Sequence, residues 1–339
     1  MSEHVLDVKG LTVDFKTDQG IVHAVRDVTL EVNEGQIVGL VGESGSGKSV
    51  TMYSIMGLVA DNGKITAGSV ELDGVSIAKN DFANVKEYNK KMNEIRGSKM
   101  AMIFQDPMTF LNPTKTIGHQ ITEVILNHNE CTGEQAKERA IELMKMVGIP
   151  SPEKRFKQYP FEFSGGMRQR IIIAIALANE PRLIIADEPT TALDVTIQAQ
   201  VLDLIKKLSK EEGSSVILIT HDLAVVASLC DYIYIMYGGK IVESGSDREI
   251  FFDPRHPYTK GLLGCIPDPD NISKELKPIP GSPPDLLKPP EGCPYVDRCN
   301  EAMRICKRLM PEYTQFTETH KSACWLNIIE EQKNTEQEG

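Results

Sequence analysis

The most specific chemistry in the sequence lies in the glycine-rich segment GLVGESGSGKSV, residues 39–50. Gly42 is followed by four residues and then by Gly47, Lys48 and Ser49, directly after an apolar run and before a helical stretch. Glycines let successive backbone N–H groups turn inward around a phosphate, lysine reaches the β and γ oxygens, and serine can bind Mg²⁺. The segment therefore predicts a nucleotide triphosphate site. The candidate binding residues are Gly42, Ser44, Gly45, Ser46, Gly47, Lys48, Ser49 and Val50.

Two other interpretations of this segment are weaker. A flexible strand-to-helix turn would need neither the lysine nor the serine. A dinucleotide site would show the spacing G-x-G-x-x-G, but position 50 is Val. We therefore retain the phosphate loop as the prediction.

An acidic pair supplies the chemistry that a phosphate loop lacks. Asp187 and Glu188 follow the apolar run in RLIIADEP, which predicts a buried strand with both carboxylates at its end. Asp187 would orient hydrated Mg²⁺, and Glu188 would activate the attacking water. Such a pair can also be only a helix cap, but the phosphate loop upstream favours the catalytic interpretation.

Further motifs follow in a fixed order. Along the chain they are Gln105 in IFQDP, FSGGMRQR at 163–170, Asp194 in TTALD and His221 in LITHD. Together with the phosphate loop and RLIIADEP, they resemble the motifs of ABC-type ATPases over the first 250 residues or so. The resemblance implies that the nucleotide is ATP.

The resemblance also implies a role for each motif residue. Gln105 would sense Mg²⁺ and the membrane partner, so that the Mg²⁺ ligands are Ser49, Gln105 and Asp187. His221 would contact the γ-phosphate and position water, which makes Glu188 and His221 the catalytic pair. Taken alone, Gln105 could be a loop residue and His221 a core histidine.

A second set of residues would act on the partner's ATP. By the resemblance, Ser164, Gly165 and Gly166 face the γ-phosphate bound to the opposite subunit, at a helix N-terminus that supplies N–H donors. Asp194 would lie at the dimer seam. Met167 stands where the widespread pattern has Gln, so the backbone donor survives and a side-chain amide is lost. Closure of two such chains would assemble the catalytic site.

An early aromatic residue is the candidate for adenine stacking. The family places an aromatic side chain on an early loop, and Phe15 in TVDFKT matches that place. Packing in the core is the alternative role for Phe15.

Strands must position these motifs. Short β-branched runs at 36–42, 99–105, 182–187 and 215–220 alternate with helical stretches, which predicts an α/β fold with a mainly parallel sheet. We expect an ABC-type nucleotide-binding domain over 1–255, with an inserted helical subdomain at about 85–175. Residues 256–339 would form a proline-rich, irregular C-terminal extension with a cysteine cluster at 293–324.

Composition and charge restrict the location and the partners. The chain has 339 residues, 41% of them hydrophobic, and no apolar run long enough to cross a bilayer. Its N-terminus lacks the features of a secretory signal. The net charge of −11 disfavours a nucleic acid as the main partner. We expect a peripheral protein on the cytoplasmic face of the membrane.

The extension indicates what is moved. FFDPRHPYTKGLLGCIPDP, with PIPGSPPDL after it, resembles the C-terminal part of peptide-importer ATPases of the dipeptide, oligopeptide and nickel group. His256 in this stretch, taken alone, is more often a surface turn residue than a ligand. The resemblance implies a second ATPase subunit, often a different chain, two transmembrane permease subunits and an external peptide-binding protein. Alternatives are import of nickel or another small solute, and a soluble ATPase acting on ribosomes or DNA.

Four cysteines lie in the C-terminal part of the chain: Cys293, Cys299, Cys306 and Cys324. A reducing compartment argues against disulfides, and the spacing lacks the C-x-x-C pairs of common zinc sites. The resemblance implies a 4Fe-4S cluster, with zinc, free thiols and packing on one apolar helix face as alternatives. A straight helix would hold Cys299 and Cys306 about 10.5 Å apart along its axis. We therefore predict that no single helix spans both: Cys299 lies before or at a helix start, Cys306 lies on or beyond that helix, and Cys324 returns from a later loop.

Overall fold

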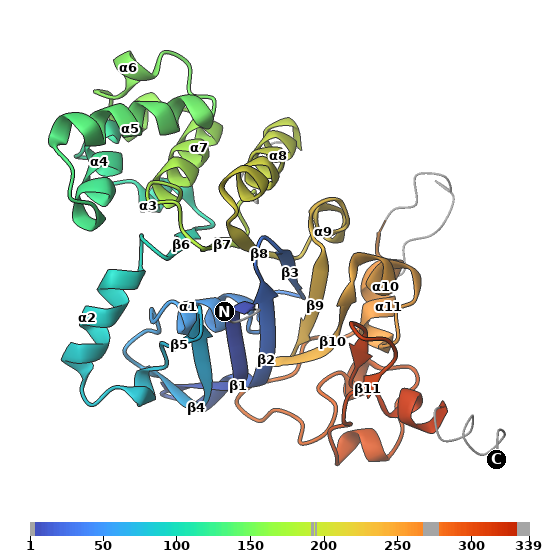
Figure 1. Ribbon diagram of the computed structural model, residues 1–339. Helices are drawn as coiled ribbons and strands as arrows, with labels where there is room; N and C mark the ends of the chain where they lie inside the picture. The colour runs from blue at the N-terminus through green and yellow to red at the C-terminus, as the bar shows by residue number, and fades with distance from the viewer. Residues whose placement is uncertain (1–3, 191–192, 194, 267–277, 331–339) are drawn as a thin grey trace. The chain divides into compact units, whose positions relative to one another are not determined.

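The computed structural model describes residues 4–190, 193, 195–266 and 278–330 (Figure 1). The contacts within this part of the chain divide it into two compact units. Unit 1 contains residues up to 6, residues 32–37 and residues 72–219. Unit 2 contains residues 7–31, residues 38–71 and the residues from 220 onward. The boundary expected at residue 255 stays a prediction, since unit 2 includes residues on both sides of it.

The parallel strands of unit 1 lead into the motifs predicted to be catalytic. They run in the order β8 (Ser215–Thr220), β7 (Leu183–Asp187) and β6 (Met100–Ile103). Every residue of these strands is buried, which is typical of parallel strands covered on both faces. The strands predicted from these three sequence runs are confirmed.

Helices α2 to α7 of unit 1 fall within the stretch 85–176. Thr116 accepts the N–H of His119 at the start of α4, and Thr132 forms a capping box with Gln135 at the start of α5. These caps satisfy N–H groups that a helix leaves unpaired in its first turn. The helices and short elements of unit 1 are η1 (Lys79–Asp81), α2 (Val85–Ile95), α3 (Pro107–Phe110), α4 (Ile117–His128), α5 (Gly133–Met146), α6 (Pro152–Arg155), η2 (Pro160–Glu162), α7 (Gly165–Ala176), α8 (Val195–Glu212) and strand β5 (Val75–Ser76).

Unit 2 holds two groups of strands. One runs in the order β3 (Ile37–Val41), β9 (Tyr232–Tyr237), β10 (Lys240–Ser246), β12 (Lys321–Ser322) and β11 (Thr314–Gln315). The other is β2 (Gly20–Asn33), β1 (His4–Thr17) and β4 (Gly63–Leu72). The pair β3 and β9 is parallel, and β9, β10, β12 and β11 pair antiparallel. The strand predicted at 36–42 is thereby confirmed as β3.

The helices of unit 2 are short, and the first of them follows the phosphate loop. They include α1 (Lys48–Ile55), α9 (Leu223–Leu229), α10 (Asp247–Phe252), α11 (Pro257–Gly264), η3 (Val296–Arg298) and η4 (Ile305–Lys307). Among the described residues of the whole chain, no helix has the length and the apolar run needed to cross a bilayer.

The C-terminal extension is held to the rest of unit 2 by hydrogen bonds to its backbone oxygens. Residues 278–290 form no helix or strand, as their prolines predict. Within this segment the oxygen of Leu286 accepts the N–H of His23 at 2.9 Å, and the oxygen of Pro290 accepts from Arg26 Nη2 at 2.7 Å. Farther along, β12 adds to the edge of β10.

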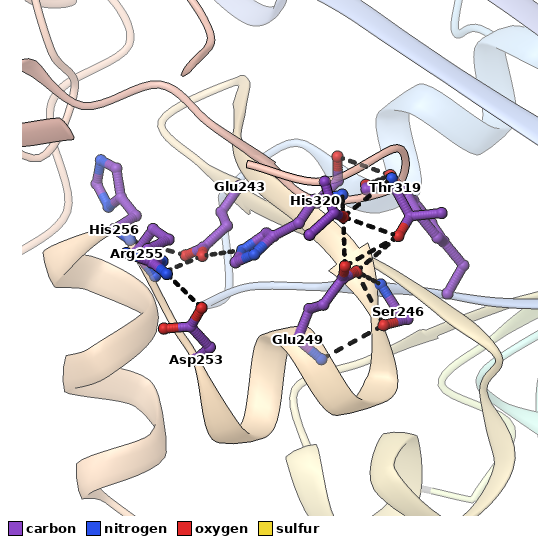
Figure 2. A network of polar contacts seen from close by, with 11 residues as sticks. Glu243, Ser246, Glu249, Asp253, Arg255, His256, Thr319 and His320 are labelled. Carbon is purple, nitrogen blue, oxygen red and sulfur yellow. Dashed lines mark hydrogen bonds and ion pairs between the residues drawn. The ribbon is translucent and has the colours of Figure 1, made fainter. Parts of the chain in front are cut away.

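A buried carboxylate fixes the end of the extension (Figure 2). Glu243 of β10 and His320 are both fully buried. The Glu243 carboxylate accepts from His320 Nε2 at 2.9 Å, and from the backbone N–H groups of Arg255 at 2.6 Å and His256 at 2.9 Å. Burial raises the pKa of Glu243, but these hydrogen bonds outweigh it, so that the pKa lies below its ordinary value. The charged carboxylate therefore joins three segments of unit 2.

A second carboxylate, Glu249, predicts acid sensitivity. Burial raises its pKa, but hydrogen bonds from Thr317, Ser246 and Thr319 outweigh this and lower the pKa to about 2. Its stabilising effect is present above the ordinary pKa of 4.5 and is lost as the pH falls from there toward 2. Glu249→Gln should lower the free energy of unfolding at pH 7 by about 1–2 kcal/mol, after discounting for solvent screening. Denaturant midpoints at pH 7 and pH 3 measure this. The exposed Glu318→Gln is the control and should change neither midpoint.

Candidate functional site

The phosphate loop joins β3 to α1, and its backbone passes very close to neighbouring chain segments. A Cβ atom at Gly42 would lie 2.1 Å from the backbone oxygen of Met236. Gly47 has a φ of +104°, and a Cβ there would lie 2.5 Å from the oxygen of Ala24. Glycine is therefore required at both ends of this loop.

Lys48 lies within the loop and is only 5% exposed. Its Nζ donates to the backbone oxygens of Gly42 at 2.7 Å and Glu43 at 2.9 Å. Ser44 and Gly45, at the tip of the loop, are exposed. The Lys48 ammonium thus lies where the β and γ oxygens of a bound nucleotide are expected. A bound phosphate would compete with the two carbonyl groups for its hydrogen bonds.

The other predicted loop residues surround the start of α1. Ser46 is buried, and its backbone oxygen accepts the N–H of Gly239 at 3.0 Å. Ser49 and Val50 are half-buried in the first helical turn. The positive end of a helix dipole and its unpaired N–H groups favour an anion at this place.

Adding one methyl group at Gly42 should disrupt nucleotide binding. Gly42→Ala would force the loop away from Met236, and overpacking of this kind costs about 1–3 kcal/mol. We expect ATP affinity to fall by about 5- to 150-fold, measured by titration with a fluorescent ATP analogue. Gly39→Ala in β3 is the control: its Cβ would lie 3.0 Å from a Val226 side-chain carbon and 3.1 Å from the Cys230 sulfur, which can move. Equal affinity losses in both variants would contradict the prediction.

The predicted catalytic carboxylates lie beside Gln105. Asp187 ends β7 and Gln105 follows β6, and these strands pair in parallel with Ile103 opposite Ala186. The carboxyl ends of both strands thus meet at one edge. Gln105 Nε2 donates to Glu188 Oε2 at 2.7 Å, and Asp187 is 2% exposed. The structure thus brings Gln105 and Glu188 together within unit 1, and their roles stay predictions.

The backbone at Glu188 is strained. Its φ is +44°, a left-handed value that is uncommon for residues other than glycine. The Glu188 N–H donates to the oxygen of Ile219 in β8 at 2.9 Å, which holds the residue in place. Such strain is concentrated at functional sites, where the surrounding structure enforces it.

The signature residues form an accessible helix N-terminus in unit 1. Ser164 caps α7 and accepts the N–H of Met167 at 3.4 Å. Ser164 and Gly165 are exposed, and a Cβ at Gly165 would meet nothing within 4 Å. A Cβ at Gly166 would lie 2.8 Å from Ile197 Cγ2. The side facing solvent is therefore free to receive a ligand, and its role at a partner's ATP remains a prediction.

The remaining predicted site residues have mixed outcomes. Phe15 is half-buried near the end of β1, and its ring occupies the space that a Cβ at Gly63 would need, at 2.6 Å. His221 is exposed directly after β8. Asp194 lies outside the described residues. Phe15, His221 and the phosphate loop belong to unit 2, whereas the carboxylates predicted to be catalytic and the signature residues belong to unit 1.

Comparisons with known proteins decide the family. A family model described as ABC transporter matches residues 25–191, and one described as oligopeptide/dipeptide transporter, C-terminal region, matches residues 242–306. The dipeptide transport ATP-binding protein DppD of Bacillus subtilis (strain 168) is 50% identical over 96% of this chain and 95% of its own length. The chain belongs to the ABC transporter family.

Other relatives of this ABC protein agree with that assignment. The oligopeptide transport ATP-binding protein OppD of Escherichia coli (strain K12) is 44% identical over 97% of this chain and 95% of its own. A solved ATP-binding cassette, dimeric and bound to ADP and Pi in a post-hydrolysis state, matches 72% of this chain and 99% of its own. That match has 31% sequence identity and a TM-score of 0.62. The α/β nucleotide-binding fold is thus confirmed.

The four cysteines of this ABC protein line one small pocket, with Cys293, Cys306 and Cys324 buried and Cys299 half-buried. The N–H of Cys293 donates to the oxygen of Cys306 at 2.8 Å. Burial, with a smaller contribution from the neighbouring thiols, raises the pKa of Cys293 to about 12 and that of Cys324 to about 11. In the described part of the chain, no three His, Cys, Asp or Glu side chains are arranged as a metal-binding group.

The backbone between the cysteines is broken, as predicted. Cys299 follows the short helix η3, Cys306 lies in η4, and Cys324 comes after β12. No straight helix joins Cys299 to Cys306. Packing along one helical face is therefore excluded as the reason for their spacing.

His256 is the residue that sequence reasoning misjudged. It is 1% exposed, so the expectation that it lies in a surface turn is wrong. Its Nδ1 accepts the N–H of Tyr258 at 3.1 Å, so Nε2 carries the proton, and Nε2 has no partner among the described residues. His256 lines the same pocket as the cysteines. The signal was the helix start in HPYT, where proline at the first helical position marks His256 as the cap.

Proposed function

We propose that this chain is the ATP-hydrolysing subunit of an ABC importer that takes up dipeptides or oligopeptides. The observation that carries the proposal is the similarity of nearly the whole chain to peptide-transport ATP-binding proteins, including the C-terminal region at 242–306. Nickel or another small solute is the alternative cargo, and a soluble ATPase acting on ribosomes or DNA is a more distant one.

The chemistry follows from the roles of the site residues. Lys48 and the N–H groups of the phosphate loop bind the β- and γ-phosphates. Glu188 takes a proton from the attacking water, Gln105 holds the Glu188 carboxylate, and His221 contacts the γ-phosphate.

The oxygen donors of Ser49, Gln105 and Asp187 match the preference of Mg²⁺ for hard ligands. Bound Mg²⁺ would neutralise charge on the phosphates. Phe15 is proposed to stack on the adenine.

The accessible signature helix suggests the partners. Ser164, Gly165, Gly166 and Met167 would contact ATP held by a second ATPase subunit, with Asp194 at the seam. Dimer closure would drive two membrane-spanning permease subunits, to which an external binding protein delivers the peptide. The chain would thus sit peripherally on the cytoplasmic face of the membrane.

Co-purification from detergent-solubilised membranes tests this assignment. An affinity-tagged chain should retain integral membrane subunits and a second ATPase. Recovery of ribosomal proteins or DNA in their place would overturn the importer assignment.

We further propose that Cys293, Cys299, Cys306 and Cys324 hold a 4Fe-4S cluster. Four thiols lining one pocket supply the number and type of ligands that such a cluster needs. The unpartnered Nε2–H of His256 faces no other acceptor among the described residues, and a cluster sulfur would accept it. The cluster would stabilise the fold of an extension that has little hydrophobic core of its own.

Anaerobic purification tests the cluster. We expect about four iron and four sulfide per chain, with charge-transfer absorbance that Cys299→Ser removes. Zinc bound without visible absorbance, or four thiols that react freely with a thiol reagent, would overturn this proposal. Cys131→Ser, outside the pocket, is the control.

A further inference from the structure

Glu43 of the phosphate loop is held at two points by the C-terminal region. Its backbone N–H donates to Tyr258 Oη at 3.0 Å, and its carboxylate accepts from Arg298 Nη1 at 2.7 Å. Tyr258 lies in α11 and Arg298 in η3, more than 200 residues farther along the chain. All three residues belong to unit 2.

Arg298 is fixed by several acceptors. Its side chain is 6% exposed, against 26% for Glu43. Nε donates to the oxygen of Pro280 at 2.8 Å, and Nη2 donates to the oxygen of Ile279 at 3.1 Å. Nη1 also donates to Tyr237 Oη at 3.1 Å. A planar guanidinium with this many hydrogen-bond acceptors is held in one orientation, so Arg298 can set the position of the Glu43 carboxylate that it binds.

The same two residues adjoin the cysteine pocket. Arg298 directly precedes Cys299, and Tyr258 packs against Tyr295, with ring centroids 5.3 Å apart. Tyr295 and Cys299 both line the pocket. The order of the cysteine pocket and the position of Arg298 are therefore physically linked.

We infer that Arg298 and Tyr258 are positioning residues for the phosphate loop, through which the C-terminal extension sets nucleotide affinity. The inference rests on the proposed ATP function. The backbone oxygen of Glu43 also accepts a hydrogen bond from Lys48 Nζ. Anchoring Glu43 therefore preorganises both the backbone of the phosphate loop and the Lys48 ammonium. Arg298 further neutralises a carboxylate that would otherwise repel the triphosphate.

The coupling must run in both directions. If the extension strengthens ATP binding, ATP must stabilise the extension by the same factor. A purely structural role for Arg298 would not make the stability of residues 293–306 depend on nucleotide. Hydrogen exchange of this segment with and without ATP thus separates the two roles.

The experiment titrates the full-length chain with a fluorescent ATP analogue. Arg298→Met should weaken binding at least about fivefold, and Tyr258→Phe should weaken it less. The double variant Glu43→Gln with Arg298→Met should bind better than Arg298→Met alone, because no unpaired carboxylate remains. Nucleotide should protect residues 293–306 in the wild type and not in Arg298→Met. If Arg298→Met fails to fold, Arg298→Lys provides the same comparison.

The control variant is Tyr313→Phe, elsewhere in the extension, which loses a hydrogen bond to the backbone oxygen of Ile241 in β10. It should bind the analogue as the wild type does. Equal weakening in Tyr313→Phe, or an Arg298→Met affinity within twofold of the wild type, would overturn the inference. A wild-type chain that binds no ATP analogue would instead overturn the proposed function.

Discussion

Replacing Glu188 by Gln should lower ATP turnover by about 10²- to 10⁴-fold while ATP binding persists. The amide has almost the same shape as the carboxylate and can still accept the hydrogen bond from Gln105 Nε2. It cannot take the proton of the attacking water, and a positioned general base contributes a rate factor of this size. Phosphate release measures turnover, and a fluorescent ATP analogue measures binding.

The matched control for this variant is Glu130→Gln, a change of the same chemistry at an exposed position of unit 1. Its turnover should equal that of the wild type. Turnover by Glu188→Gln within about threefold of the wild type would show that another group takes the proton. A parallel loss of ATP binding would show that Glu188 acts in the ground state as well.

Replacing Glu243 by Met should destabilise unit 2 by about 3–5 kcal/mol. The change has nearly the same volume but leaves His320 Nε2 and the N–H groups of Arg255 and His256 without their acceptor in a buried place. Losing one partner of a buried charged network has costs of this size. The denaturant midpoint measures the effect.

A double-mutant cycle separates the interaction energy of Glu243 with His320 from the effect of each substitution on packing. His320→Leu alone removes the side-chain partner of Glu243, and both changes together remove the whole hydrogen-bonded pair. Because the residues are in direct contact, the double variant should be more stable than the sum of the single losses predicts. Strict additivity would contradict the role assigned to this pair.

The sequence alone allows prediction of those parts of the site that local sequence patterns determine. Apolar runs ending in polar residues predict parallel strands, and the carboxyl ends of adjacent parallel strands meet at one edge. This explains why Gln105 and Glu188, 83 positions apart, lie within hydrogen-bonding distance. It also explains why the phosphate loop could be located, since glycine spacing and helix starts are local features.

The contacts of the extension could not be predicted in the same way. Arg298 and Glu43 are 255 positions apart, and Glu243 and His320 are 77 apart. Neither pair lies in a periodic pattern, so only the folded chain brings its members together. His256 was misjudged because a single histidine carries no signal of its burial. The broken backbone between Cys299 and Cys306 was predictable, because a helix would have separated the thiols.

Uptake of radiolabelled peptide by intact cells tests the central assignment most directly. Cells in which the wild-type chain replaces the chromosomal copy should take up labelled dipeptide or oligopeptide. Cells with Glu188→Gln should not, although the protein is present at the same level. Nickel uptake should be the same in both. Peptide uptake that survives Glu188→Gln, or a loss confined to nickel, would contradict the proposal that this chain powers peptide import.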